Sequence, residues 1–138
     1  MTLLETNGFD ADLPTYVIWE GNTMYLTSGD VRRILAELNA GVRDVRISFD
    51  YMADAVIAKT TGDAGVTSLV ESFANMGARW LSGIRDIDTL ARELGFRVVD
   101  NRWAGELART NEWKRPLTSA IFDLYAVCTL QALPKPPA

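Results

Sequence analysis

The sequence predicts a single α/β domain in which helices pack on both faces of a sheet. Segments with apolar residues at every second position alternate along the chain with segments whose apolar residues recur every third or fourth position. This is the pattern of strands separated by helices. The 138 residues match the length of one domain, and 48% of them are apolar, which is enough to build a core.

The first elements are a strand over residues 16–19 and a helix that follows it. Thr27 is a typical N-cap, Asp30 suits the first helical turn, and apolar residues then recur at helical spacing up to Gly41. The next segment, VRISFDY over residues 45–51, alternates apolar and polar side chains. It therefore predicts a second strand.

Later segments continue the alternation of helices and strands. We expect a helix over 66–73 that closes at Gly77 and a helix over 87–94 with Asp86 or Asp88 at its start. A strand over 96–99 follows, then a short helix or lid over 102–112, and then a long last strand over 119–131. The remaining residues, 132–138, read as a flexible tail because they are rich in proline.

Composition excludes several classes of function. The net charge is −4 and the basic residues are scattered, so nucleic acid is not an expected partner. There is no histidine, which removes the Ser-His and Cys-His nucleophile pairs and imidazole metal sites, and we expect no metal. The single cysteine, Cys128, argues against a disulfide framework, and no apolar stretch reaches the roughly 20 residues of a membrane span. We expect a cytoplasmic protein without a membrane partner.

Glu20 raises a question because it directly follows the apolar strand 16–19. A charged group is costly to bury without a partner, so Glu20 either lies at the surface or serves a ligand. In α/β sheets ligands bind at the carboxyl ends of the strands, where Glu20 ends the first strand and Asp50 and Tyr51 end the second. A solvated turn residue is the other interpretation of Glu20.

The segment YVIWEGNTMYL, with the following helix and VRISFDY, resembles the central part of the leucine carboxyl methyltransferase family. This family comprises class I S-adenosylmethionine-dependent enzymes with a Rossmann-like sheet, including polyketide O-methyltransferases. The later segment GARWLSGIRDIDTLARELGFRVVD resembles a Ser-Gly, helix and Gly-Phe strand segment of the same family. The resemblance implies an O-methyltransferase that acts on a carboxyl group or a small molecule.

The resemblance also implies roles for individual residues. Glu20 and Gly21 would contact S-adenosylmethionine, Tyr25 would line the methyl-transfer pocket as the catalytic residue, and Tyr51 and Trp80 would contact the acceptor. Further candidates for the acceptor side are Asp50, Trp103, Trp113, Arg79, Arg85 and Arg115. Each has a structural alternative: Tyr and Trp often pack in cores, a strand-end Asp often forms a turn, and arginines mostly lie exposed.

The sequence lacks one part of the family pattern, because its glycines never form a G-x-G loop. The resemblance then implies that residues 1–131 hold the fourth to seventh strands, with the last strand antiparallel. We expect weak or absent cofactor binding by the chain alone, a small acidic molecule as acceptor, and either an N-terminal methyltransferase half or a homodimer contact at the free edge of strand 16–19. The alternative is a non-catalytic interaction module that binds itself or another protein through this edge.

Overall fold

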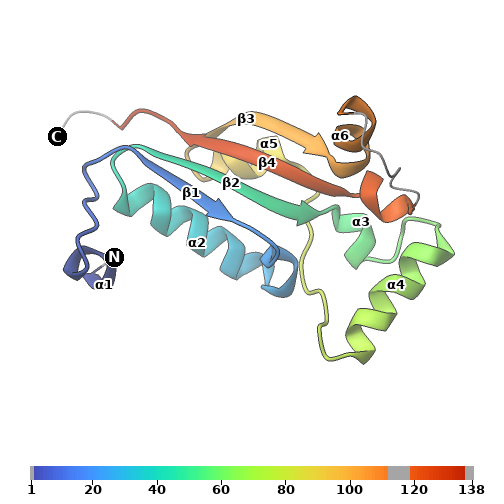
Figure 1. Cartoon of the computed structure of the whole chain (residues 1–138). Helices are drawn as coiled ribbons and strands as arrows, with labels where there is room; N and C mark the ends of the chain where they lie inside the picture. Colours follow the sequence, from blue (N-terminus) through green and yellow to red (C-terminus); the bar gives the residue numbers. More distant parts are fainter. Residues whose placement is uncertain (1, 112–118, 136–138) are drawn as a thin grey trace.

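The structure, a computed structural model, describes residues 2–111 and 119–135. Four strands form one mixed sheet in the order β1-β2-β4-β3 (Figure 1). β1 is parallel to β2, whereas β4 is antiparallel to both of its neighbours, β2 and β3. The last strand is antiparallel, as expected, and inserts between the two that precede it. The strands are β1 (Thr15–Trp19), β2 (Val45–Met52), β3 (Phe96–Trp103) and β4 (Tyr125–Ala132).

Helices connect the strands, and side-chain caps fix where the longer ones begin. The Oγ1 atom of Thr27 accepts a hydrogen bond from the Asp30 amide at 3.1 Å, and Asp86 caps its helix in the same way, so both predicted caps are confirmed. Asp88 lies in the first turn instead. The helices are α1 (Thr2–Thr6), η1 (Thr23–Tyr25), α2 (Ser28–Gly41), α3 (Asp54–Ile57), α4 (Ala64–Asn75), α5 (Ile87–Glu93), α6 (Ala104–Thr110) and η2 (Ala120–Asp123).

The two crossover helices α2 and α5 cover the same face of the sheet. Leu35 of α2 and Leu90 of α5 belong to one buried cluster with the alternating residues Val45, Ile47 and Phe49 of β2. Right-handed crossovers that advance in one direction across a sheet place their helices on one side. Both long crossover helices therefore lie on one face, and the second face of the predicted sandwich is met by α6. The short helix α6 reaches the second face, where Leu107 lies near Val127 at one end.

A second buried cluster forms beyond the carboxyl end of β2. It joins α4, η1 and η2, and Figure 1 shows α4 past the arrowhead of β2. Trp80 is 6% exposed and belongs to this cluster, with its ring centroid 5.0 Å from that of Phe73. The buried members of the cluster are Met24, Met52, Val56, Val66, Val70, Trp80 and Ile121.

The boundaries of the last elements differ from the prediction. β3 extends to Trp103 because a bulge between Val98 and Asp100 shifts the pairing and breaks the simple alternation in the sequence. The last strand begins at Tyr125, since a 3-10 helix occupies 120–123. Ala132, assigned to the tail, is the final residue of β4. Trp113, Arg115 and residues 136–138 lie outside the described residues.

Candidate functional site

Glu20 and Gly21 lie at the carboxyl ends of the parallel strands β1 and β2, a region called here the carboxyl rim. The Glu20 side chain is exposed, and within the described part of the chain no cation pairs with it. Gly21 has a φ of +74°, a left-handed conformation that favours glycine and that turns the chain away from β1. Its amide donates a hydrogen bond to Oδ1 of Asp50 at 2.8 Å. The turn that presents Glu20 is thus fixed from β2.

Asp50 is the residue that joins the parts of the carboxyl rim. It is 3% exposed, although it is charged. One carboxylate oxygen accepts from Gly21, the other accepts from the Tyr125 hydroxyl, and its backbone oxygen accepts from the Thr23 hydroxyl. Such bonds are what a buried carboxylate needs. Through these bonds Asp50 connects β2 with the turn after β1, with η1 and with β4, while the acceptor contact considered from sequence stays a prediction.

Tyr125 is a member of the carboxyl rim that the sequence reasoning missed. Burial, followed by its hydrogen bond to Asp50 and by the negative charges of Asp50 and Glu20, raises the pKa of Tyr125 well above its ordinary value. Tyr25, which is 37% exposed, contributes to the same shift, so its hydroxyl is within electrostatic range. In sequence, Tyr125 fell inside a predicted strand. The Tyr125 hydroxyl, a polar group in an apolar strand, was the only feature in the sequence that could have indicated its role.

A depression of about 310 Å³ opens between the carboxyl rim and α6. Glu20, Asp50 and Tyr125 form its polar end, while Leu107 and Val127 contribute apolar surface. The structure therefore brings Glu20 and Asp50 together and adds Tyr125 to them. This arrangement can hold a cationic group at the carboxylates while it keeps water away from the apolar side.

Tyr51 points away from the carboxyl rim, because it follows Asp50 on the same strand. It is 3% exposed, donates to Oδ1 of Asn101 at 3.1 Å, and meets Trp103 edge-on with ring centroids 6.1 Å apart. Burial raises the pKa of Tyr51 to about 12. Tyr51, Asn101 and Trp103 line a separate pocket of about 560 Å³ with four carboxylates, those of Asp54, Asp86, Asp88 and Asp123.

The structure does not bring Tyr51 and Trp80 together. The two side chains belong to different buried clusters, and Trp80 packs on Phe73. Among the described residues, no acceptor lies within hydrogen-bond distance of Nε1 of Trp80. Arg79 is exposed, and Arg85 pairs with Asp54 at 2.9 Å. The acceptor roles of these residues stay predictions.

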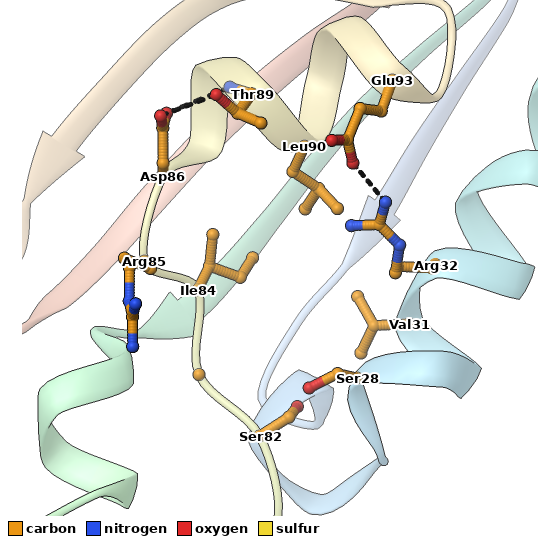
Figure 2. A pocket seen from close by; sticks show the side chains of 11 residues that line it. Ser28, Val31, Arg32, Ser82, Ile84, Arg85, Asp86, Thr89, Leu90 and Glu93 are labelled. Carbon is orange, nitrogen blue, oxygen red and sulfur yellow. Dashed lines mark hydrogen bonds and ion pairs between the residues drawn. The ribbon is translucent and has the colours of Figure 1, made fainter.

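A further pocket of about 350 Å³ lies between α2 and α5. Figure 2 shows the apolar side chains of Val31, Ile84 and Leu90 between the two helices, with an ion pair between Arg32 and Glu93 beside them. Neither Glu20 nor Tyr51 lines it. It lies between the two helices, on the face of the sheet that they cover.

Within the described ranges, no three His, Cys, Asp or Glu side chains are placed to hold a metal ion. No helix in those ranges has the length and apolar character needed to cross a membrane.

Comparisons with solved structures define the class of fold. The chain superposes on a candidate methyltransferase from Thermobifida fusca with a TM-score of 0.60, at 16% identity over 92% of this chain and 46% of that one. It also matches a mycolic acid cyclopropane synthase solved with SAH, with a TM-score of 0.51, at 10% identity over 91% and 56% of the two chains. Magnesium protoporphyrin IX methyltransferase from Synechocystis, solved with SAH, gives 0.49 at 12% identity, over 89% and 48%. The α/β fold is thus similar to part of the Rossmann-like domain of the two structures with the higher TM-scores.

The family model of leucine carboxyl methyltransferase matches residues 1–39. This segment contains β1, the Glu20-Gly21 turn, Tyr25 and most of α2. The match covers the segment EGNTMYL, from which the resemblance to this family was first drawn. A comparison with curated protein sequences finds no significant match. The chain spans about half the length of the solved structures that it resembles.

Proposed function

We propose that this chain is the acceptor-side part of an S-adenosylmethionine-dependent O-methyltransferase and that an N-terminal half supplies the glycine-rich cofactor loop. One observation carries the proposal: Glu20 and Gly21, in the segment that the family model matches, lie at the carboxyl ends of parallel strands in a methyltransferase-like sheet. Ligands of such sheets bind at this position. Without the N-terminal half we expect no methyl transfer.

The residues of the carboxyl rim fit the amino-acid end of the cofactor. The exposed carboxylate of Glu20 can accept charge-assisted hydrogen bonds from an ammonium group, and Asp50 holds the adjacent Gly21 turn in place. S-adenosylmethionine supplies an activated methyl group when bound. Transfer to an oxygen then depends mainly on positioning and on exclusion of water, which requires no histidine. Affinity of the chain alone should be weak, because a ligand of this size needs most of its surface buried.

The acceptor is proposed to be a small molecule with a hydroxyl or carboxyl oxygen. Tyr25, the last residue of η1, is the candidate for the methyl-transfer pocket. Among the described residues, the pocket beside Tyr51 is lined by four carboxylates and one cation, Arg85, which already pairs with Asp54. Negative charge disfavours an anionic ligand there. The small acidic acceptor expected from the sequence would therefore need cations supplied by the N-terminal half, because carboxylates also line the Glu20 side.

A non-catalytic interaction module is the second candidate. Its supporting observation is the uncovered face of the sheet, where Ile18 is 72% and Tyr16 is 58% exposed. Such side chains indicate a contact surface. This function predicts partner binding without methyl transfer.

The deciding experiment replaces Glu20 by Gln in a complex of this chain with an N-terminal half from the same family. We expect cofactor affinity to fall roughly 10- to 150-fold, the effect of losing a charge-assisted hydrogen bond. Isothermal titration of the complex measures it, and Glu71→Gln, an exposed carboxylate on α4, is the matched control. Tyr25→Phe should lower turnover with unchanged cofactor affinity.

Two results would contradict the proposal. Equal cofactor affinity of wild type and Glu20→Gln would remove the cofactor role of the carboxylate. Micromolar or tighter binding by the 138-residue chain alone would show that no N-terminal half is needed.

A further inference from the structure

The two edges of the sheet are built differently. β3 carries Arg97, Asp100 and Arg102 and has a bulge between Val98 and Asp100. Charges and bulges are the devices by which proteins keep edge strands from pairing. β1, with the sequence TYVIW, has neither a charge nor a bulge. The β1 edge is therefore left open to pairing.

Backbone groups of β1 point to this free edge. The Thr15 amide donates to the Asp44 carbonyl at 2.8 Å, on the side of β2. Because hydrogen-bonding groups alternate along a strand, the N–H and C=O groups of Tyr16 and Ile18 point the other way. The side chains of the same two residues lie on the uncovered face and are 58% and 72% exposed. Tyr16 and Ile18 thus offer both backbone and side-chain contacts.

The strand is complementary to itself in one register. If two copies of β1 pair antiparallel about Val17, Tyr16 of each copy comes opposite Ile18 of the other. Each of these pairs would exchange two backbone hydrogen bonds, because both residues point their backbone groups outward. The paired side chains, one aromatic and one β-branched, would also lie on the same face, which is a favourable cross-strand combination.

We propose that the β1 edge binds the same strand of a second copy of this chain, so that two four-stranded sheets join into one. The proposal does not depend on methyl transfer. The resemblance to the family assigns the same edge to the first strand of an N-terminal half, so the homodimer and the assembled enzyme exclude each other. Dimerisation then keeps the unassembled chain from exposing its apolar edge.

Charge sets a limit on this dimer. In the proposed register Glu20 of one copy lies opposite Pro14 of the other, near Asp12, and each chain has a net charge of −4. Like charges repel, and salt screens exposed charges that are about a Debye length apart. Added salt should therefore strengthen the dimer.

Light scattering coupled to size-exclusion chromatography tests the proposal on the isolated chain. At concentrations of about 100 µM we expect twice the 15.3 kDa mass of one chain. A high concentration is needed because a contact along one strand must offset the entropy that two chains lose when they associate. Ile18→Glu should weaken the dimer by at least roughly tenfold, because it places a charge on the edge. Met76→Glu, a change at another exposed apolar residue, should leave the dimer intact.

Two further measurements keep the test decisive. Ile18→Pro removes only an outward-pointing donor and should also yield monomers, while a thermal melt confirms that each variant is folded. Amide exchange at Tyr16 and Ile18 should slow as the concentration rises, whereas Val17 should be protected at every concentration. A monomeric wild type, an assembly larger than a dimer, or a dimer that Ile18→Glu leaves unchanged would each overturn the proposal, and the methyltransferase proposal would still stand.

Discussion

The two faces of the sheet differ in what covers them. On the face packed by α2 and α5, Ile47, Cys128 and Leu130 are fully buried. On the other face, Ile18 and Val127 are 72% and 39% exposed. Successive side chains of each strand point to opposite faces, so the same strands contribute residues to both faces. The comparison teaches that the covered face supplies the stability of this chain, whereas the uncovered face is available for ligands and partners.

Asp50 is the polar exception on the uncovered face, where Met52 is also buried. It lies between Phe49 and Tyr51, which both point to the covered face, yet it is itself 3% exposed. Its burial comes from η1 and Tyr125, which close over the carboxyl rim. At this one place the second face has a polar core of its own.

The largest effect is expected on the covered face. Leu130→Ala removes a fully buried side chain and should lower the free energy of unfolding by about 2–5 kcal/mol. Thr129→Ala, its neighbour on the other face, removes a hydrogen bond to Ser48 and should cost about 0.5–1.5 kcal/mol. Urea unfolding measures both. Equal costs would mean that the two faces contribute alike.

An intermediate effect is expected at the buried exception. Asp50→Ala leaves the Gly21 amide and the Tyr125 hydroxyl without their acceptor, and a buried unpaired group costs about 1–3 kcal/mol. Asp50→Asn keeps acceptor capacity at one oxygen and should cost less. Urea unfolding, with the Gly21 amide followed by NMR, measures this. If Asp50→Ala is as stable as wild type, the polar core of the carboxyl rim contributes no stability.

The smallest effect concerns the cap of α5, the helix on the covered face. Hydrogen bonds from Thr89 lower the pKa of Asp86 below its ordinary value of 3.8. A depressed pKa in the folded state contributes stability above the unfolded value, and this stability is lost as the pH falls through the folded pKa. The stability difference between wild type and Asp86→Asn should therefore shrink below a pH of about 3.8.

Urea unfolding at several pH values follows this difference. Asp88→Asn, on the same helix but outside the cap, is the control. A difference that stays constant from neutral to acidic pH would contradict the cap argument.

The uncovered face also explains why the candidate site was only partly predictable. Glu20 and Gly21 were found because a charge and a glycine directly after an apolar strand form a local pattern. Asp50 was placed from sequence at the end of the second strand, but its bonds to Gly21 and Tyr125 were not predicted, since Asp50 and Tyr125 are separated by 75 positions in the chain. Trp80 was assigned to the acceptor side by the resemblance, and the sequence could not choose between that role and core packing because aromatic residues occur in both pockets and cores. Only packing against Phe73 places it in a core.

By itself the sequence determined the local elements of this protein. The alternation in VRISFDY, the Thr27 and Asp86 caps, and the helical spacing of apolar residues all act between residues at most a few positions apart, so each can be read directly. The tertiary structure decided the insertion of β4 between β2 and β3, the placement of α2 and α5 on one face, and the burial of Asp50. These features depend on pairing and burial between distant segments, and no local pattern encodes which segments will meet.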